Sequence, residues 1–562
     1  MAKCPSCGGM LRFDIPSQQM KCDSCDSRFN PYEINGGAAE ESTEYNVTIF
    51  KCPNCGGEII STDKRAASFC SYCGASAVLE SRISSEKKPE LIIPFKQTKA
   101  QCTMAFEKFI KKAIFAPKSY RDAGKAQSFR GIYMPYWLYD MSQRGDISVP
   151  TSDSHRSGDY IITDHYMMKG TLDNYYNGVS YDASSSFADD ISSDIAPFNV
   201  KDITTFNASF LSGFYADVAD VDAGTYRNTA IDLAQESTYN YLRKSSPMAH
   251  QSFDKSKEAV KSSFLTNVNV TRSAMFPVWF MAYRNRDRVA YATVNGQTGK
   301  VSADIPMSVP KFFVFSALIA AVVFFLLQAF LTITPDVLIV IAAILGIIGA
   351  GVYCSELKKI VARENYDDDK GMLARMEAKK KARIDAQRGA SFIGQDGAYE
   401  ITQNDIRRMK TEEKKKKKEK AKATSFLSTF IVIVVLMFIF GPMALSTLAA
   451  ITSGSDVAIV GGVISLILFV ITIIMTINAK KNIDSMTSKN GLPATVFTAA
   501  SMLIIAIISF WDPPSDFIYY GAAVFAMVGI IINLIDLMRC HNLLAMRPLP
   551  QFDIYKGGDD RA

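Results

Sequence analysis

The sequence lacks the patterns that identify most nucleotide-dependent enzymes. Neither a Gly-x-Gly-x-x-Gly segment nor a phosphate-binding loop occurs in its 562 residues, which excludes the usual cradles for a dinucleotide or for ATP. Histidine is scarce, with four in the chain. His155 and His165 lie near Asp153, Asp159 and Asp164, but their spacing fits no metal motif and favours an exposed polar loop. We therefore expect no enzymatic activity.

Charge is also scarce. Charged residues make up 21% of the chain, hydrophobic residues make up 48%, and the net charge is +6. This small charge gives no support for nucleic-acid binding, and Lys51, Lys64 and Arg65 do not form the basic and aromatic stripe that such binding uses. Residues 1–310 have a mixed composition, whereas long apolar runs follow from residue 311 onward. This division excludes a purely soluble enzyme, a disordered tail protein and a fibre.

Eight of the eleven cysteines fall in the first 73 residues, in two sets with identical spacing. The first set is Cys4, Cys7, Cys22 and Cys25, and the second set is Cys52, Cys55, Cys70 and Cys73. Both have the pattern Cys-x2-Cys-x14-Cys-x2-Cys, which brings four thiolates to the corners of a tetrahedron, the geometry that Zn²⁺ accepts. Both sets also begin with Cys-Pro-x-Cys-Gly-Gly, in which glycine permits the left-handed turn of a metal knuckle. The sequence predicts tandem zinc ribbons that hold two structural Zn²⁺ ions.

Other interpretations of the cysteines are less favoured. The chain reaches Cys4 from Met1 without a signal peptide, so we expect a reducing compartment, which favours metal over disulfides. Iron in a rubredoxin-like site is the alternative metal. Four cysteine ligands leave no open coordination position, which predicts a structural or protein-docking role, with nucleic-acid contact and redox sensing as alternatives. Asp26 follows Cys25 where glycine follows the equivalent Cys73, which predicts a less regular knuckle.

Six apolar runs in the second half are long enough, or nearly so, to cross about 30 Å of hydrocarbon. We predict spans at 311–333, 336–354, 425–449, 456–478, 494–511 and 517–537. The links within each pair of spans lack lysine and arginine, whereas the connection at 355–424 and the C-terminal tail are basic. The positive-inside rule then places both termini in the cytoplasm, in a multi-pass protein of a bacterial plasma membrane. The span interiors hold almost no ionisable residues, which disfavours transport.

The basic connection at 355–424 has two interpretations. Its lysine-rich helical segments, with an unbroken lysine run at 414–418, suit a solvated helical hairpin that satisfies the positive-inside rule. They also suit contact with anionic lipid headgroups or with an acidic partner. The sequence alone does not decide between these interpretations.

Residues 91–306 have the pattern of an α+β domain. Apolar periodicity predicts helices at 99–115, 223–243 and 252–265. The serine-rich segment at 182–193 predicts a surface loop.

Two aromatic strand-like segments, at 131–139 and 276–280, resemble each other. After the second, residues 288–301 predict a hairpin around Asn295 and Gly296, since Asn-Gly is a strong turn former.

The expected fold class is multidomain, with two small β zinc ribbons, an α+β cytoplasmic domain, and an all-α membrane domain of six transmembrane helices. The predicted parts are zinc ribbon 1 at 1–35, zinc ribbon 2 at 48–80, the α+β domain at 91–306, transmembrane hairpins at 311–354, 425–478 and 494–537, the basic connection at 355–424, and the tail at 538–562.

Together these motifs resemble those of bacterial membrane-anchored tandem zinc-ribbon proteins, a group often labelled transcription-factor-type zinc-ribbon proteins. The resemblance rests on the two ribbons and on the segments at 93–95, 133–137, 277–279, 294–301, 547–552 and 557–562. Six spans exceed the number in the simplest members. Some relatives are associated with an envelope-stress system that contains SPFH-domain proteins and phage-shock protein A. The resemblance implies a membrane anchor that recruits such soluble partners.

The leading hypothesis is a non-enzymatic plasma-membrane scaffold. Its cytoplasmic zinc ribbons, α+β domain and tail would recruit soluble proteins in an envelope or membrane stress response. Membrane lipids and cytoplasmic proteins are the expected partners, and an oligomer is compatible with the sequence. A membrane-tethered nucleic-acid-binding regulator is the first alternative, and it predicts strongly salt-dependent binding. A transporter with a zinc-stabilised cytoplasmic domain is the second, and the uncharged spans disfavour it.

Overall fold

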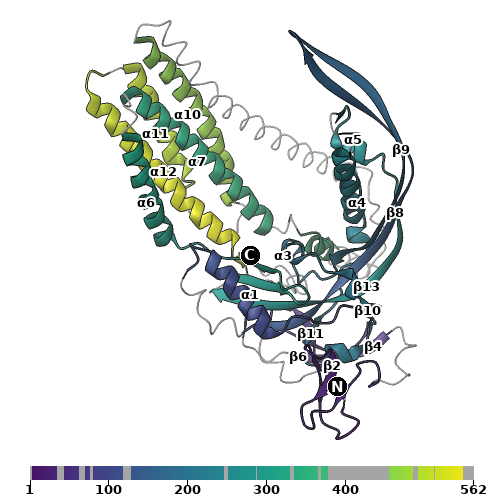
Figure 1. The fold of residues 1–562 in the computed structure, drawn as a ribbon. Helices are drawn as coiled ribbons and strands as arrows, with labels where there is room; N and C mark the ends of the chain where they lie inside the picture. Colours follow the sequence, from purple (N-terminus) through teal and green to yellow (C-terminus); the bar gives the residue numbers. More distant parts are fainter. Residues whose placement is uncertain are drawn as a thin grey trace, which may run out of the picture. The chain divides into compact units, whose positions relative to one another are not determined.

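In the computed structural model, the chain folds into two compact units (Figure 1). The residues that it describes are 3–34, 44–61, 70–75, 80–117, 128–245, 248, 251–285, 288–328, 335–364, 367, 369–377, 455–484, 492–511 and 513–548. Unit 1 comprises Met1–Phe313, Ala362–Lys380 and His541–Ala562, and unit 2 comprises Val314–Val361 and Lys381–Cys540. Unit 1 therefore combines the polar half of the chain with two segments that follow apolar helices.

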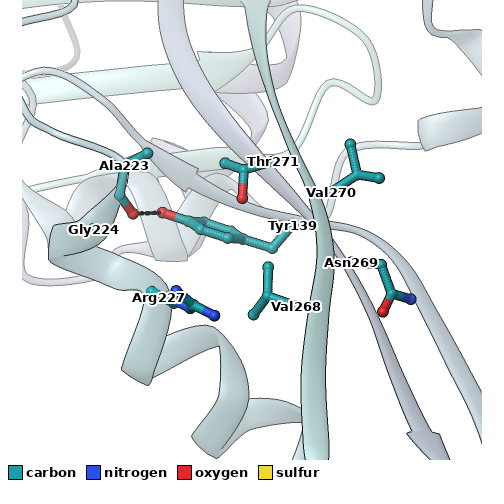
Figure 2. Close-up of a pocket in the computed structure, with 8 residues that line it drawn as sticks. All are labelled: Tyr139, Ala223, Gly224, Arg227, Val268, Asn269, Val270 and Thr271. Carbon is teal, nitrogen blue, oxygen red and sulfur yellow. Dashed lines mark hydrogen bonds between the residues drawn. The ribbon is translucent and has the colours of Figure 1, made fainter.

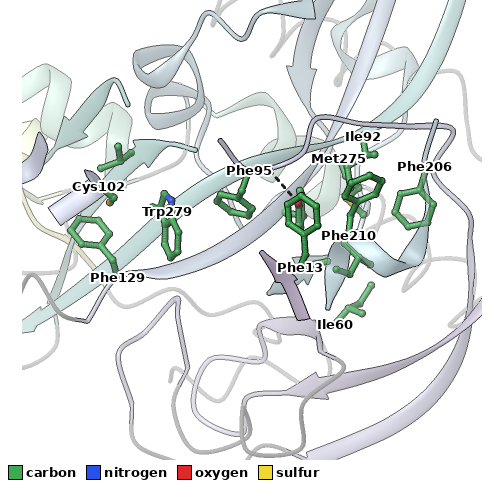
Figure 3. Packing of buried hydrophobic residues seen from close by; sticks show 14 of the residues in the cluster. Phe13, Ile60, Ile92, Phe95, Cys102, Phe129, Phe206, Phe210, Met275 and Trp279 are labelled. Atoms are coloured by element: carbon green, nitrogen blue, oxygen red, sulfur yellow. Dashed lines mark hydrogen bonds between the residues drawn. The ribbon is translucent and has the colours of Figure 1, made fainter. Parts of the chain in front are cut away.

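The N-terminal sheet of unit 1 belongs to the first cysteine ribbon. Its three antiparallel strands are β1 (Leu11–Asp14), β2 (Gln19–Cys22) and β3 (Arg28–Phe29). Leu11 and Phe13 are buried and Arg12 between them is exposed, the alternation of a strand with one packed face. The Phe13 ring lies 5.1 Å from that of Phe210, and both belong to one buried cluster (Figure 3). The first ribbon therefore packs on the central domain.

The second sheet has thirteen strands among the residues that the structure describes. Along its main path lie β10 (Thr204–Thr205), β7 (Leu91–Ile92), β13 (Thr266–Asn285), β8 (Arg130–Ser157), β11 (Tyr215–Asp217), β5 (Glu58–Ser61), β4 (Glu44–Lys51) and β6 (Glu80–Lys87). Off this path lie β9 (Tyr160–Asp182), β12 (Ser252–Phe253), β14 (Arg288–Asn295), β15 (Val301–Ala303) and β16 (Arg547–Pro548). Strand β11 pairs antiparallel with β5 and parallel with β8. The strands of the second cysteine ribbon therefore continue the sheet of the central domain.

The two aromatic segments noted in the sequence pair with each other. In the antiparallel β8–β13 ladder, Met134 lies opposite Phe276 and Ile132 lies opposite Val278. All four side chains are fully buried, and the ring of Tyr136 stacks on that of Phe276 at 4.5 Å. The two similar segments therefore form neighbouring strands, and their side chains pack in the same hydrophobic core.

The predicted Asn-Gly hairpin is confirmed by the pairing of β14 with β15. The Asn295 side-chain oxygen accepts hydrogen bonds from the backbone N–H groups of Gln297 and Thr298, both at 2.9 Å. A Cβ atom at Gly296 would lie 2.6 Å from the Phe95 ring. Asparagine thus stabilises the turn, and glycine permits the close approach of Phe95.

The described helices of unit 1 include α1 (Lys99–Lys112), α3 (Asp189–Ile195), α4 (Gly224–Lys244) and α5 (Lys257–Lys261). Helix α1 begins with a capping box, in which Thr98 Oγ1 accepts from the Gln101 N–H at 3.3 Å and Gln101 Oε1 accepts from the Thr98 N–H at 2.8 Å. The predictions at 99–115 and 223–243 are confirmed. The prediction at 252–265 is largely wrong, because residues there form strand β12 and only a short helix.

The serine-rich segment at 182–193 is not the predicted surface loop. Ser184, Ser185 and Ser192 are buried. Ser184 donates a hydrogen bond to Asp217, and Ser185 Oγ donates to Asp220 Oδ2 at 2.7 Å. The prediction was wrong because serine composition indicates polarity, and here the hydroxyl groups find carboxylate partners inside the fold.

Residues 369–377, at the start of the basic connection, cover this segment. The Lys370 N–H donates to Asp189 Oδ2 at 2.9 Å, and Arg375 Nη1 donates to Ser185 Oγ at 2.6 Å. The Met372 side chain is buried in the core of the central domain. Residues 369–377 of the basic connection are therefore packed on the central domain. The later part of the connection, residues 378 to 424, lies outside the described residues.

The docked segment should loosen as pH rises. Asp369 precedes the helical residues 370–377 and accepts the Met372 N–H at 2.8 Å. Burial raises the pKa of Asp369 to about 7, with a contribution from Asp189. Because the pKa of Asp369 is higher in the folded protein than the unfolded value of about 4, the fold favours the protonated carboxyl group. The stability that this group contributes is therefore complete below about pH 4 and is lost as the pH rises through about 7.

Hydrogen exchange, corrected for its intrinsic pH dependence, should report this as weaker protection of residues 370–377 at pH 8 than at pH 5.5. Asp369→Asn should reduce the difference, since it keeps an oxygen acceptor and removes the charge. Equal pH dependence in the variant and the wild type would contradict the assignment to Asp369.

An ion-pair network, whose arginines are largely buried and whose Asp190 is partly exposed, ties the C-terminal segment and the end of an apolar helix to the central domain. Arg547 Nη2 donates to both oxygens of Asp190, at 2.6 and 2.7 Å. Arg363 Nη2 lies 3.2 Å from both Asp304 and Asp190. Burial opposes ionisation of Asp190, but Arg547 and Arg363 hold the pKa of that carboxyl below its usual value. We call Asp190, Asp304, Arg363 and Arg547 the Arg547 network.

Arg288 adds a further anchor beside this network. Its guanidinium pairs with Glu364 at 2.9 Å and donates to the backbone oxygen atoms of Leu543 at 2.8 Å and Met546 at 3.0 Å. Strand β16 also pairs with β14, so that Val289 lies opposite Arg547. The beginning of the predicted tail is therefore held by both side chains and backbone, and residues 549–562 lie outside the described part of the chain.

Unit 2 is built from apolar helices. These are α7 (Pro335–Glu364), α10 (Ser455–Asp484), α11 (Thr495–Trp511) and α12 (Asp516–Leu544), and α6 (Val309–Gln328) enters from unit 1. Small residues such as Ala343 and Ala526 pack inside with Met502, while large apolar side chains such as Phe517 and Val524 face outward. An apolar exterior around a packed helical core is typical of helices in lipid.

In the part of the chain that the structure describes, three helices are long and apolar enough to cross a membrane: Leu338–Glu364, Gly462–Asp484 and Asp516–Leu544. The prediction of six spans is therefore not supported. The apolar stretches at Val309–Val323 and Thr495–Trp511 are shorter, and a full crossing needs about 17 to 25 residues. The run predicted at 425–449 lies outside the described residues. The fold class is corrected accordingly, to a multidomain protein with three candidate spans among its described residues.

Candidate metal centres

The structure brings the eight predicted cysteine ligands together in two groups. One is Cys4, Cys7, Cys22 and Cys25, and the other is Cys52, Cys55, Cys70 and Cys73. Within each group, all four sulfur atoms lie within 4.8 Å of one another. No other group of three or more histidine, cysteine or acidic side chains converges in this way among the described residues. The tandem arrangement fits two metal-binding ribbons.

The sulfur–sulfur distances fit a tetrahedral metal ion. They are 3.5 Å for Cys7–Cys22 and 3.7 Å for Cys4–Cys25 in the first group. In the second group they are 3.6 Å for Cys55–Cys70 and 3.8 Å for Cys52–Cys73. A tetrahedron with metal–sulfur bonds of about 2.3 Å has sulfur–sulfur edges of about 3.8 Å. Both donor sets therefore fit a structural metal ion with four thiolate ligands and no open position.

Four backbone turns hold the sulfur atoms at this spacing. In each turn the first cysteine of a Cys-x2-Cys pair accepts, through its backbone oxygen, the N–H of the residue four positions later, at 2.8 to 3.1 Å. That later residue has a positive φ in every turn: Gly8, Asp26, Gly56 and Gly74. Asp26 adopts φ 56° and keeps the turn that glycine makes elsewhere, since aspartate tolerates the left-handed region. The expected irregularity of this knuckle is not observed.

The thiols of each group compete for protons. Hydrogen bonds from the Cys55 and Cys70 thiols lower the pKa of Cys52 to about 6, while contact with Cys52 raises the pKa of Cys55 far above its ordinary value. In the first group the Ser27 hydroxyl and backbone N–H lower the pKa of Cys25 to about 6. Four close thiolates need a compensating charge, which a bound dication supplies.

The two centres differ in burial. All four sulfur ligands of the second group belong to buried residues, each 1% exposed or less. Phe50 and Phe280 share the buried cluster that encloses them, and the Asn54 side-chain amide donates to Cys73 Sγ at 3.4 Å. In the first group Cys7 and Cys25 are exposed. The second centre is therefore part of the core of the central domain, and the first lies at the surface.

The first ribbon is attached to the central domain through residues other than its exposed ligands. The Gln18 side-chain amide donates to the Phe95 backbone oxygen at 2.8 Å. The Tyr32 hydroxyl lies 2.6 Å from Thr204 Oγ1 and donates to the Thr205 oxygen at 2.9 Å. These contacts orient the ribbon while the Cys7 and Cys25 side remains accessible.

This difference in exposure predicts two rates of metal release. A high-affinity chelator should remove one equivalent per chain from the first centre at least about tenfold faster than the other, because the second must await opening of the core. Element analysis of full-length protein after timed chelation measures this. Cys7→Ser should abolish the fast phase and leave the slow one. A single phase that carries both equivalents would contradict the difference between the centres.

His155 and His165 do not form a metal site with other residues that the structure describes. They lie on strands β8 and β9, which make a long hairpin whose residues 154–167 are exposed on both faces (Figure 1). His165 Nδ1 lies 3.1 Å from Asp254 Oδ2, and His155 Nδ1 lies 4.0 Å from Asp164. The preference for exposed polarity is confirmed, although the segment is a strand hairpin and not a loop.

A cavity of about 240 Å³ lies between α4 and a bulge in β13 (Figure 2). It is lined by Tyr139, Ala223, Gly224, Arg227, Val268, Asn269, Val270 and Thr271. The Tyr139 hydroxyl donates to the Ala223 backbone oxygen at 2.6 Å. Neither a carboxylate nor a histidine lines this cavity, so it offers no acid–base pair.

Sequence reasoning found the ligands but missed Asn54, which contacts Cys73, and the Arg547 network, which anchors the C-terminal segment. Asn54 and the residues of the Arg547 network carry no spacing signal. Asp190 and Arg547, for example, are 357 positions apart. Only the folded chain brings such groups together.

Comparison with known proteins identifies one relative of unknown role. The chain is 27% identical to the uncharacterized protein YdjG of Bacillus subtilis (strain 168) over 315 residues, which cover 54% of this chain and 90% of the relative. No protein-family model matches the chain. No solved structure matches it either.

Proposed function

We propose that this protein is a non-enzymatic membrane scaffold whose first cysteine ribbon presents a metal-stabilised docking surface to soluble proteins. The observation that carries the proposal is the difference between the two centres. The second is enclosed in the core, whereas the first lies at the surface with Cys7 and Cys25 exposed. A rigid, exposed module with a closed metal site suits docking with little rearrangement.

Zn²⁺ is the proposed ion in both centres. Its support is the all-cysteine donor set at tetrahedral spacing, combined with the cytoplasmic location expected from the sequence. Iron in the same sites would give a coloured, redox-active protein. Element analysis of the purified chain distinguishes the two, and two equivalents of zinc per chain are expected.

The proposed location is a bacterial plasma membrane, with both termini in the cytoplasm; this arrangement needs an even number of crossings, and hence at least one, such as α6, in addition to the three candidate spans. Its support is that the start of α6, the end of α7 and the end of α12 all belong to the same compact unit as the N-terminal half. The segments that follow α7 and α12 are basic, which favours a cytoplasmic position for these helix ends and for the unit to which they belong. By resemblance, the proposed partners are SPFH-domain or phage-shock-type proteins of an envelope-stress response.

Affinity capture of the full-length protein from its native membrane tests the proposal. The double variant Cys7→Ser/Cys25→Ser should lose one metal equivalent and its specific soluble partners while the second metal and the central domain are retained. Arg144→Ala, at an exposed ion pair with Asp173, is the matched control. A captured partner must then bind the purified wild type and not the double variant. An unchanged partner set would count against the ribbon as the docking surface.

The nucleic-acid alternative has less support. Basic side chains of the first ribbon are paired with carboxylates: Arg12 with Asp23 at 3.0 Å, and Lys21 with Asp26 at 3.0 Å. Such pairing reduces the positive field that phosphate contacts need. Strongly salt-dependent binding of DNA or RNA by the full-length protein would favour this alternative over protein docking.

A further inference from the structure

Helix α1 (Lys99–Lys112) carries an exposed basic stripe. Lys108, Lys111 and Lys112 are spaced three and four residues apart, so they share one side of the helix. All three are exposed, and none has an ion-pair partner among the residues that the structure describes. The opposite side, with Phe106 and Ile110, is buried against the sheet. The stripe is therefore fixed in orientation, and its charges face no carboxylate partner within the described part of the chain.

The same end of α1 meets the point where the chain enters its first apolar helix. The Ser308 N–H donates to the Phe115 backbone oxygen at 2.8 Å. Lys311 Nζ donates to the Ala116 oxygen at 2.7 Å, and the rings of Phe115 and Phe312 lie 5.5 Å apart. All of these residues belong to unit 1. The segment that directly follows the basic stripe therefore contacts the first turn of α6 (Val309–Gln328).

Exposed apolar side chains accompany the lysines. Ile114 is 62% exposed and Met104 is 60% exposed. Helix α6 exposes Val314, Leu318 and Val322 in the same way. A helix exposing so many apolar groups suits lipid tails, and a neighbouring helix with lysines beside apolar residues suits the headgroup region. The chemistry at this end of α1 therefore matches a bilayer surface with anionic phosphates.

We infer that α1 lies against the anionic headgroups of the membrane that receives α6. Lys108, Lys111 and Lys112 bind lipid phosphate groups, and Ile114 contacts the boundary between headgroups and acyl chains. This contact orients the central domain at the bilayer surface. It rests on the membrane anchoring proposed above, and it is independent of partner recruitment and of the basic connection at 355–424.

Lysine footprinting of full-length protein in lipid nanodiscs tests this inference. Discs of phosphatidylcholine alone are compared with discs that contain 30% phosphatidylglycerol, using a water-soluble acetylating reagent and mass spectrometry. Each bound lysine should react about fivefold more slowly in the anionic discs. High salt should restore its rate. Lys201, Lys244 and Lys255, which are exposed and lie elsewhere in unit 1, should react equally in both.

A matched pair of variants separates this contact from a general effect of charge. Ile114→Asp should reduce the protection of the three lysines, whereas Leu265→Asp, at a position that is 72% exposed, should leave it unchanged. Equal reactivity in the two kinds of disc, or protection that Ile114→Asp does not affect, would overturn the inference. Because the discs contain only this chain and lipid, a negative result leaves partner recruitment untouched. Failure of the chain to enter discs would instead count against membrane anchoring.

Discussion

Cys55→Ser is expected to unfold the central domain of the full-length protein. Cys55 and its three partner ligands are enclosed in the core, and their strands β4 and β5 continue the large sheet through β11. A structural zinc site contributes about 10 to 16 kcal/mol of binding free energy. The net stability of a domain is about 5 to 15 kcal/mol. Loss of this site therefore removes most or all of the stability.

Circular dichroism and limited proteolysis of detergent-solubilised protein measure this effect, with metal content determined in parallel. Cys102→Ser is the matched control, because Cys102 is a buried thiol that belongs to neither cysteine group. It should cost only about 1 to 3 kcal/mol, the price of burying a hydroxyl without a full set of partners. Cys7→Ser should release one metal and leave the large sheet intact. A folded Cys55→Ser protein with one metal would show that the second centre is dispensable for the fold.

Arg547→Ala should also destabilise the protein, by about 1.5 to 3 kcal/mol, the usual range for losing hydrogen bonds to a charged group that is partly exposed. Its side chain is 13% exposed and holds both oxygens of Asp190. Removing it leaves Arg363, among the described residues, as the counter-charge for Asp190 and for the half-buried Asp304. The free energy of unfolding, or the melting temperature of the protein in detergent, is the quantity to measure.

The control for Arg547→Ala is the same substitution at Arg144. That side chain is 65% exposed and pairs with Asp173 at 3.0 Å, and a surface pair of this kind contributes about 0 to 1 kcal/mol. Equal effects of the two substitutions would show that the Arg547 network is not the anchor of the C-terminal segment. A larger effect at Arg547 would also link the end of α12 to the folding of the central domain.

The difference between the two metal centres connects these expectations to function. A ligand set inside the core serves the fold, and its loss removes the whole domain. A set at the surface can be altered while the domain remains intact, which makes its variants informative about binding. Experiments on partner recruitment should therefore use Cys7 and Cys25 and avoid the second set.

Local sequence was sufficient for the features that close within about twenty residues. The cysteine spacing identified both ligand sets, because each knuckle is a single turn and each ribbon is a short hairpin. The Asn295–Gly296 turn and helix α1 were likewise predicted, since turn chemistry and apolar periodicity act between near neighbours. Apolar composition indicated membrane helices, and three of the six predicted spans coincide with helices that are long and apolar enough to cross a membrane among the described residues.

Only the tertiary structure decided how these pieces combine. Strand β11 fuses the second ribbon to the central sheet, and residues 369–377 bury the serine-rich segment that composition assigned to the surface. The Arg547 network joins side chains up to 357 positions apart. Such contacts depend on which distant groups share a buried space, and they leave no period or spacing in the sequence. The ligands were therefore a property of the local chain, whereas the burial of one centre and the exposure of the other arose from long-range packing.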